Sequence, residues 1–386
     1  MRRRLVLALA AAGTLTATVG AASAAPSNHG QSVRNSHVCG QPSTGAAACN
    51  AIRHDVVDRN GKPVKPPSTP RGYGPADIQA AYGLGGGSAQ TVAVVDAYDD
   101  PTAEADLATY RSTFNLPACT TANGCFRKVG QNGGSTLPAS NGSWAQEISL
   151  DLDMVSAACP GCHILLVEAN SATFANLAAA VNTAAATAGV VAISNSYGGG
   201  DQPELSAYNH PGIAVVASTG DSGYGVQSPA SFPHVIAVGG TSLNKSGSSY
   251  TESAWSGAGS GCSTQNPKPS WQSAATQCSG KANADVSAVA DPNTGVAVYD
   301  STRYQGVGGW LQFGGTSASA PIIASAYALG GNLSGYPASY TWGHSSSLHD
   351  VTSGSNGTCS TAVWCHAGSG WDGPTGLGTP NGVAAF

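Results

Sequence analysis

Apolar residues along the chain occur as short continuous runs and as helically spaced stripes. The continuous runs predict buried strands at residues 91–95, 163–168, 190–194, 213–218 and 234–239. The helically spaced stripes predict helices at residues 75–82, 102–114, 143–158, 174–188 and 317–329. Apolar strands that alternate with helices are typical of a covered parallel sheet. We therefore expect an α/β fold with a doubly wound, mostly parallel sheet and helices on both faces.

The first residues have the pattern of a secretory signal peptide. Met1-Arg2-Arg3-Arg4 is followed by an apolar stretch to about Val19 and then by Ala22-Ser23-Ala24. The apolar stretch is too short for a good membrane span, so we expect no membrane association and a secreted, extracellular protein. Residues 25–70 are poor in periodicity and rich in Pro, Ser, Gly and Asn, and we expect an irregular extension or short propeptide there. A single domain then fills residues 71–386.

The charge content excludes one class of partner. Charged residues make up 10% of the chain, against about 25% in typical proteins, and the net charge is −5. There is no basic stripe, so we expect no nucleic-acid partner. A surface with few ionisable groups develops little repulsion between like charges at low pH. The composition is therefore compatible with a protein that functions at acid pH.

The ten cysteines fall into five close pairs, which in a secreted chain indicates disulfides. We assume nearest-neighbour pairing, although the sequence alone leaves the connectivity open: Cys39/Cys49, Cys119/Cys125, Cys159/Cys162, Cys262/Cys278 and Cys359/Cys365. Cys159-Pro160-Gly161-Cys162 also has the spacing of a redox motif or half a zinc site. No second pair with zinc-site spacing accompanies it.

A candidate nucleophile lies in Gly314-Gly315-Thr316-Ser317-Ala318-Ser319. The two glycines permit a close approach of backbone to substrate, and Ser317 falls in the first turn of a helix, whose free N–H groups favour negative charge. Such a serine can attack a carbonyl while its own N–H holds the oxyanion. The alternative is an ordinary helix N-cap. The full string is more specific, because subtilisin-like peptidases carry their nucleophile in it.

A serine nucleophile needs a base, and none of the histidines has the sequence context of the subtilisin base. They are His29, His37, His54, His163, His210, His234, His344, His349 and His366.

Two carboxylates offer a replacement for the histidine. Glu147 and Asp151 are four residues apart and share one face of the helix at 143–158. Two like charges at this spacing repel each other. This repulsion is avoided if one group carries a proton, and it is otherwise expected only where the pair has a functional role. The alternative is an ordinary solvated acidic face.

Asp221, in Ser218-Thr219-Gly220-Asp221-Ser222-Gly223, ends a buried strand. Subtilisins have an oxyanion-binding asparagine at this place, and an aspartate can donate there only when it is protonated. The alternative is a turn aspartate that accepts backbone N–H groups.

Together these motifs resemble the sedolisin family of serine-carboxyl peptidases, from about Gly72 to Phe386. The resemblance implies a subtilisin-like fold and an acid-active endopeptidase that acts on protein or peptide substrates through an acyl-enzyme. It implies that Glu147 is the general base for Ser317, that Asp151 orients Glu147 and that Asp221 lines the oxyanion hole. We expect a monomer.

The resemblance implies further site residues. The substrate would add as a strand to an edge formed by Ser194, Ser196, Tyr197 and Gly198, although family members often have Trp in place of Tyr197. Asp96 would be a supporting acid, with a strand-end capping role as the alternative. One structural Ca²⁺ would bind the side chains of two aspartates and three backbone carbonyls. These ligands are Asp350, Val351, Gly368, Gly370 and Asp372.

The chain departs from the family in one respect. Many sedolisins carry a long folded prodomain, whereas only about 45 residues separate the predicted signal peptide from the peptidase. Either this segment is the whole propeptide or the enzyme folds unaided. Two alternative functions remain from the sequence, a histidine-based serine hydrolase and a binding protein on an inactive peptidase scaffold.

Overall fold

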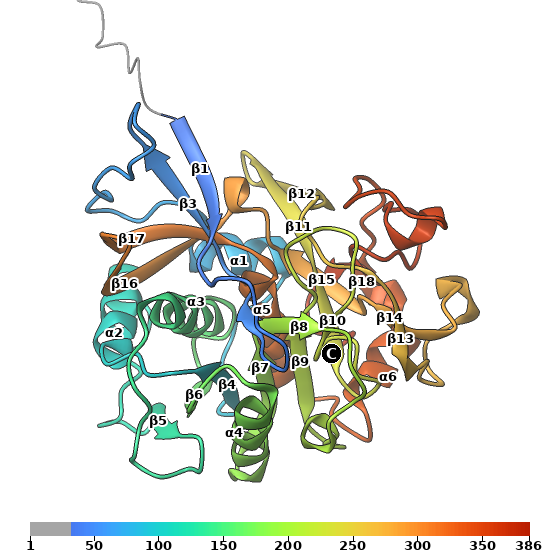
Figure 1. The fold of residues 1–386 in the computed structure, drawn as a ribbon, viewed down its shortest axis with the longest axis horizontal. Helices are drawn as coiled ribbons and strands as arrows, with labels where there is room; N and C mark the ends of the chain where they lie inside the picture. The colour runs from blue at the N-terminus through green and yellow to red at the C-terminus, as the bar shows by residue number, and fades with distance from the viewer. Residues whose placement is uncertain (1–31) are drawn as a thin grey trace, which may run out of the picture.

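The structure is a computed structural model and describes residues 32–386 (Figure 1). The predicted signal peptide at residues 1–24 lies outside the described residues. An eight-stranded sheet forms the centre, in the order β12-β11-β9-β7-β4-β6-β5 with β15 also paired to β11. Its strands are β4 (Thr91–Ala97), β5 (Phe126–Gly130), β6 (His163–Ala169), β7 (Val190–Asn195), β9 (Ala214–Ser218), β11 (Ile236–Ser246), β12 (Ser249–Ala254) and β15 (Val286–Val289).

The sheet is parallel except for β12, which returns antiparallel to β11. Residues Val92–Val95 in β4 are fully buried, as expected for a central strand covered on both faces. The five predicted helices are present with ends shifted by at most a few residues, and a short sixth follows them. The helices are α1 (Pro75–Tyr82), α2 (Ala103–Thr113), α3 (Gly142–Ala158), α4 (Phe174–Ala186), α5 (Thr316–Gly330) and α6 (Pro337–Gly343). The predicted α/β class is therefore confirmed.

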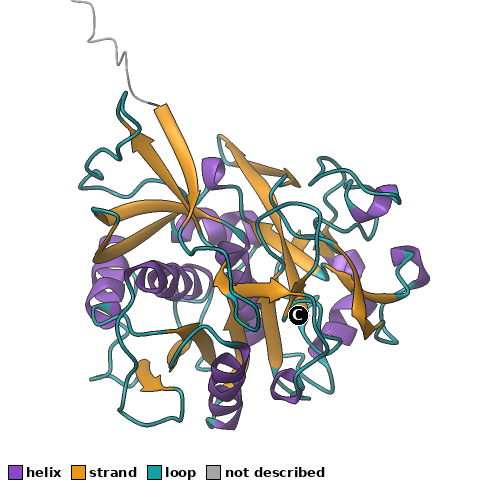
Figure 2. Cartoon of the chain, viewed as in Figure 1, coloured by secondary structure: helices purple, strands orange, loops and turns teal. Residues whose placement is uncertain are grey.

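Helices α3 and α5 form the centre of the packing around the sheet (Figure 2). They pack on each other, and α5 also packs on β7, β9 and β15. Every residue from Trp144 to Ala158 and from Thr316 to Ala328 is buried. Surface helices usually bury only one stripe, so helices buried on all sides hold their side chains in a closed environment.

The N-terminal segment is more regular than its composition indicated. It contains β1 (Ser32–His37), β2 (Ala48–Cys49) and β3 (Ile52–Val57). Strand β3 pairs with β1 and with β17 (Val307–Gly314), which forms a hairpin with β16 (Val296–Tyr304). Figure 1 shows these strands side by side above α3. The composition did not indicate these strands, because β3 depends on a partner, β17, that lies about 260 residues away in the sequence, and such pairing leaves no local periodicity.

Strand β2 joins a second small sheet. It pairs with β8 (Tyr197–Gly200), and β8 pairs in turn with β10 (Gln227–Ser228). This sheet lies at the edge that the sequence predicted for substrate binding.

All five predicted disulfides are present, and no described cysteine is free. Cys159 and Cys162 are bonded to each other, so this pair offers no thiolate to a metal. Among residues 32–386, no helix combines the length and the apolar character needed to cross a membrane.

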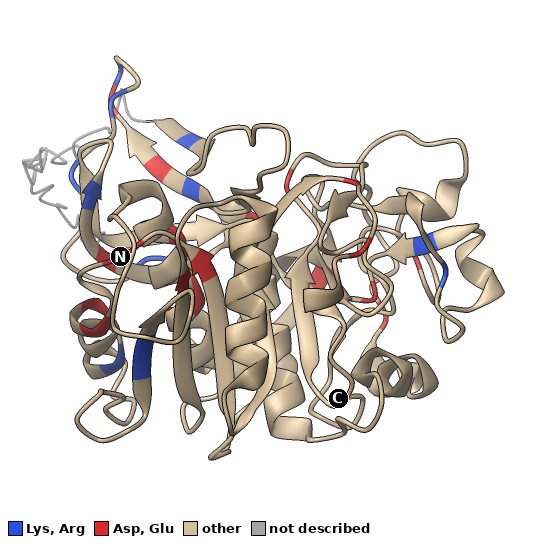
Figure 3. Ribbon diagram, turned by 60° about the horizontal axis from the view of Figure 1, so that its bottom comes forward, with Lys and Arg blue, Asp and Glu red and all other residues tan. Residues whose placement is uncertain are grey.

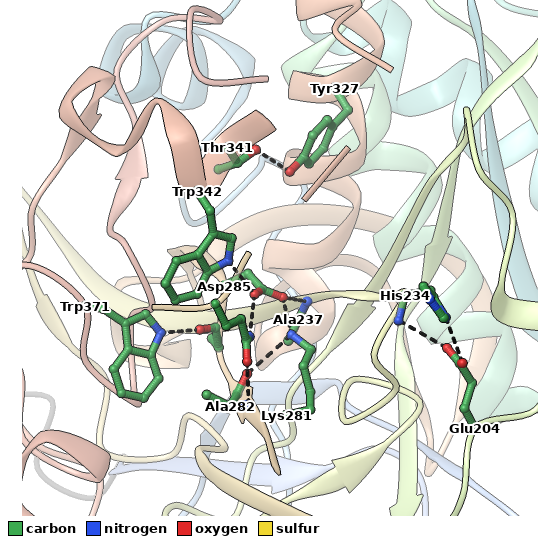
Figure 4. A network of polar contacts seen from close by, with 12 residues as sticks. Glu204, His234, Ala237, Lys281, Ala282, Asp285, Tyr327, Thr341, Trp342 and Trp371 are labelled. Atoms are coloured by element: carbon green, nitrogen blue, oxygen red, sulfur yellow. Dashed lines mark hydrogen bonds and ion pairs between the residues drawn. The ribbon is translucent and has the colours of Figure 1, made fainter. Parts of the chain in front are cut away.

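A buried polar network ties the C-terminal region to the sheet (Figure 4). Asp285 forms an ion pair with Lys281, which is also fully buried, and accepts hydrogen bonds from the indole of Trp342 and the N–H of Ala237. The indole of Trp371 donates to the carbonyl of Ala284. The remaining strands are β13 (Gly261–Pro267), β14 (Gly280–Asn283), β18 (Leu348–His349) and β19 (Thr379–Pro380).

Candidate active site

The candidate nucleophile lies at the start of α5. Gly315 precedes this helix with a φ of 92°, a conformation that favours glycine, and a Cβ there would lie 2.1 Å from the carbonyl oxygen of Asn50. The tight turn that glycine permits places Ser317 in the first helical turn. The Ser317 hydroxyl donates to the carbonyl of Ser196 at 3.1 Å. Its backbone N–H donates to the carbonyl of Asn50, also at 3.1 Å.

The candidate base lies on α3. This helix begins where the Asn141 side chain accepts the N–H groups of Ser143 and Trp144. Glu147 and Asp151 follow one turn apart, and both are fully buried. The alternative of an ordinary solvated acidic face is therefore excluded.

Burial dominates the titration of this pair. Burial raises the pKa of Glu147 well above its usual value, and the charges of Asp151 and Asp96 raise it further, while the nearby hydroxyl of Ser317 lowers it. Burial and the charge of Asp96 likewise raise the pKa of Asp151, whose carboxylate accepts the hydroxyl of Ser196 at 2.8 Å. Ionising two adjacent buried carboxyls would cost both desolvation and mutual repulsion, so the pair should hold a shared proton over a wide pH range.

Asp96, at the end of β4, is the third acid of the site. Its side chain is fully buried, and burial raises its pKa to about 8. Both of its oxygens, like both oxygens of Glu147, lack a hydrogen-bond donor among the described residues. A protonated Asp96 can donate to a neighbouring carboxylate. Figure 3 marks the Asp and Glu positions in red along the ribbon, and some of them lie on the central helices and strands.

Asp221 is the fourth acid and follows β9. One of its oxygens accepts the N–H and the hydroxyl of Thr316, at 2.7 and 2.8 Å. The other, Oδ2, has no described hydrogen-bond partner and lies beside Gly315, where a Cβ would approach both it and the carbonyl oxygen of Asn50. Burial raises the pKa of Asp221 to about 7, although the bonds from Thr316 lower it. As a neutral acid, Asp221 can donate toward this carbonyl.

The chain itself occupies the edge that the sequence predicted for substrate. Ala48 and Cys49 pair with Gly198 and Tyr197 in an antiparallel ladder, and the N–H of Asn50 donates to the carbonyl of Ser196 at 3.1 Å. The sequence carried no local signal for this strand, because residues 46–50 have neither a long apolar run nor alternation.

The four residues predicted for substrate binding lie in different places. The backbones of Ser196 and Gly198 face the bound strand. The backbone of Tyr197 pairs there too, but its hydroxyl donates to the Asn195 side chain inside the fold. Ser194 lies in β7 in the middle of the sheet, paired with Val94 and Val216, and does not reach this edge.

No described histidine hydrogen-bonds to Ser317, whose bonds go to the backbones of Ser196 and Asn50. His29 lies outside the described residues.

The predicted calcium ligands lie in one loop. Asp350 accepts the N–H of Gly370 at 2.9 Å, and Asp372 accepts the N–H of Gly368 at 3.2 Å. Burial raises the pKa of Asp372 to about 7, with a contribution from the charge of Asp350. The carbonyl oxygens of Val351, Gly368 and Gly370 accept no hydrogen bond from the described residues. Two carboxylates and three free carbonyls form an all-oxygen donor set, so the residues fit a calcium ion.

A second acidic cluster was not foreseen from the sequence. Asp100 and Asp106, at the start of α2, meet Asp300 of β16, and each of the three places one carboxylate oxygen within 4.8 Å of the others. Burial raises the pKa of Asp300 to about 8, with the charge of Asp100 adding to it. Hydroxyl and N–H groups of Thr102, Ser301 and Thr302 surround the cluster.

The family model described as the subtilase family matches residues 129–352. Kumamolisin from Bacillus sp. (strain MN-32) is 31% identical over 366 residues, which cover 82% of this chain and 63% of kumamolisin. Sedolisin from Pseudomonas sp. (strain 101) is 36% identical over 179 residues, which cover 41% of this chain and 29% of that protein. The chain thus spans less than two thirds of the length of these relatives.

Among solved structures, a Pseudomonas sedolisin, described as a serine-carboxyl proteinase complexed with two molecules of pseudo-iodotyrostatin, has a TM-score of 0.67. It is 26% identical, and the match covers 81% of this chain and 96% of that one.

We expect the buried acids to make the protein less stable as the pH rises. Burial raises the pKa of Asp96 and Asp300 to about 8 and that of Asp221 to about 7, whereas an unfolded aspartate titrates near 4. Each such group contributes fully to the free energy of unfolding at a pH below the pKa that it has in the unfolded chain. This contribution is lost as the pH rises through the higher pKa that the group has in the folded protein. The unfolding free energy should fall from about pH 4 to 8, by up to about 1.4 kcal/mol per pH unit and group.

Thermal melting of the Ser317→Ala protein across this range would measure the effect without self-digestion. A melting temperature that stayed constant or rose with pH would contradict it.

Proposed function

The chain belongs to the subtilase family and, within it, to the sedolisin family of serine-carboxyl peptidases, and we propose that it is an acid-active endopeptidase that hydrolyses protein substrates through an acyl-enzyme on Ser317. The observation that carries the proposal is the enclosure of Ser317 with Glu147 and Asp151 in a buried site where no described histidine contacts the serine. A buried serine beside a carboxyl pair has a base available, and that base is a carboxylate.

In this proposal, Glu147 accepts the proton of the Ser317 hydroxyl as the oxygen attacks the substrate carbonyl. Asp151 holds Glu147 in place and keeps a proton that lets Glu147 carry the charge. The developing oxyanion receives the N–H of Ser317 and the protonated carboxyl of Asp221. The intermediate then collapses as the peptide C–N bond breaks, and the leaving nitrogen takes the proton from Glu147 and departs as an amine. Water hydrolyses the ester that remains, which releases a carboxylic acid and restores the serine.

The same family membership supports the remaining proposals. Five disulfides support secretion to an oxidising compartment, together with the predicted signal peptide. The peptidase domain would comprise residues 71–386, act on proteins or peptides, and be monomeric. One structural Ca²⁺ would be held by the side chains of Asp350 and Asp372 and by the carbonyls of Val351, Gly368 and Gly370.

We expect hydrolysis of a denatured protein at about pH 4, lost in Ser317→Ala and in Glu147→Gln, with the double variant hardly worse than either one. The two groups act as a unit, since either loss removes the activated nucleophile. Ser325→Ala is the matched control, because Ser325 lies on the same helix and its buried hydroxyl has no described partner. Peptide release measured for all four variants tests the proposal, and full activity of Ser317→Ala would refute it.

We expect Asp221→Ala to lose about 10²–10³-fold in kcat with little change in KM, because a donor to the oxyanion is removed. The pKa of Asp221 is about 7, so the wild-type rate should fall as the pH rises through this value and the donor ionises. Asp221→Asn keeps a donor that does not titrate, so it should recover part of the loss, most clearly at the upper end of the pH range. The measurement is kcat as a function of pH for the wild type and the two variants. Turnover at the wild-type level in Asp221→Ala would contradict the oxyanion role and would show that Asp221 acts only in the turn.

We expect a chelator to lower the melting temperature, because a cation that binds only the folded protein stabilises it by mass action. Asp372→Ala should melt lower than the wild type and should no longer respond to chelator. Asp58→Ala, which removes a turn carboxylate of the N-terminal segment, is the control and should respond as the wild type does. Metal analysis that finds no calcium in the folded protein would contradict the assignment.

A further inference from the structure

The position of Asn50 indicates where one side chain of a substrate would lie in the candidate site. The carbonyl of Asn50 accepts the N–H of Ser317 at 3.1 Å, and Oδ2 of Asp221 lies beside this carbonyl. The proposed mechanism places the oxyanion at this point. A substrate that takes the place of residues 46–50 on this edge would therefore put the side chain of the residue just before the cleaved bond where the Asn50 side chain lies.

This place is a polar pocket formed by two uncharged side chains. The Asn50 amide nitrogen donates to the hydroxyl of Ser218 at 2.9 Å and to the side-chain oxygen of Gln227 at 3.4 Å. Only 5% of Asn50 is exposed, and Ser218 is fully buried at the end of β9. Because polar groups at such a depth need partners, the pocket favours a side chain that can form these hydrogen bonds.

The Ser218 hydroxyl has no use elsewhere in the described structure. Among residues 32–386, its only hydrogen bond is the one from Asn50. An apolar side chain in place of Asn50 would leave this buried hydroxyl unpaired, whereas an amide or a hydroxyl would satisfy it. Ser218 is therefore placed to distinguish polar from apolar substrate side chains.

Gln227 sets the depth of the pocket. Its backbone is fixed in β10, where it pairs with Gly200 of β8. Its side-chain amide is packed between Gly198 of β8 and Gly220 in the turn after β9, and a Cβ on Gly220 would lie 2.7 Å from the amide carbon. A Cβ on Gly198 would clash with the amide oxygen. The two glycines thus hold the Gln227 side chain flat between the substrate edge and the turn that carries Asp221.

Unused space adjoins Gln227. Its side chain also lines a cavity of about 120 Å³, together with Thr219, Ser222 and Tyr224, whereas Asn50 does not line this cavity. Gln227 therefore separates the pocket that holds Asn50 from further volume. Shortening this side chain should join the two spaces and admit a larger substrate side chain.

We propose that Ser218 and Gln227 determine which bonds the enzyme cuts, by selecting a short, neutral polar residue, Asn above all, just before the cleaved bond. Ser218 selects for hydrogen bonding, and Gln227 excludes larger side chains. This inference rests on the proposed peptidase function and names the substrate class of the same site. Aspartate has the size of asparagine, but its ionised form has no hydrogen to donate and meets no positive charge on Ser218 or Gln227.

The test compares peptides that differ only at the residue before the cleaved bond, which is Asn, Asp, Ala, Leu or Phe. Their common sequence is taken from a bond that the active protein cuts in denatured protein at about pH 4, and mass spectrometry locates each cut. We expect kcat/KM to be about 10–100-fold higher for Asn than for Ala or Leu, and lowest for Phe. The Asn-to-Asp ratio should rise between about pH 3 and 5, as the peptide aspartate ionises.

Two variants separate the two roles. Ser218→Ala should reduce the Asn-to-Ala ratio of kcat/KM about tenfold, because the hydroxyl that distinguishes the two peptides is gone. Gln227→Ala should raise kcat/KM for the Phe peptide at least about tenfold, because the cavity becomes accessible. Ratios within one preparation do not depend on how much of the protein is folded.

Matched controls replace the same residue types elsewhere in the chain. Ser325→Ala removes a buried hydroxyl of α5, and Gln265→Ala removes an exposed amide of β13. Both should keep the wild-type order of the peptides.

The possible failures are distinguishable. Cleavage by the wild type after Leu or Phe that is as fast as cleavage after Asn rejects the selectivity and leaves the proposed function standing. An order of peptides that neither Ser218→Ala nor Gln227→Ala changes rejects the roles of these two residues in the same way. An absence of Ser317-dependent hydrolysis of denatured protein rejects the proposed function, and this inference with it.

Discussion

The burial of four carboxyl groups around one serine is the constraint on which the rest of the site depends. Asp96, Glu147, Asp151 and Asp221 are at most 6% exposed, and no described Lys or Arg forms an ion pair with any of them. An unpaired buried carboxylate is costly, so protons must balance most of the charge. In the proposed mechanism such a site suits low pH, where these protons are available, because burial raises the pKa of Asp221 to about 7 and this acid is then protonated.

This constraint accounts for the central position of two helices. Helix α3 is buried on every side, which removes water from its carboxyls and fixes their rotamers against α5 and the sheet. Helix α5 brings Ser317 to the same enclosed point, and Gly315 permits the turn that precedes it. A histidine base would need no such enclosure, since its unperturbed pKa already lies near neutrality. A carboxyl base depends on its surroundings for a suitable pKa, so here the packing is part of the proposed chemistry.

The N-terminal strand adds a second use of the same edge. A peptidase that recognises backbone through sheet pairing accepts any extended segment that reaches it, including its own chain. Here residues 46–50 pair with β8 on one side and with residues 172–173 on the other, so the N-terminal segment lies along the edge that the sequence predicted for substrate.

The sequence by itself determined the α/β class, the helices and central strands and the residues that carry the candidate chemistry, because these depend on periodicity and on motifs such as that around Ser317. The disulfide pairing was an assumption from the sequence, and the tertiary structure confirmed it. Only the tertiary structure decided that the acidic face of α3 is buried, that Asp100, Asp106 and Asp300 cluster, and that the N-terminal segment pairs with β8 and β17. Each of these joins residues far apart in the chain. Burial and long-range pairing are properties of the packed chain and leave no local pattern in the sequence.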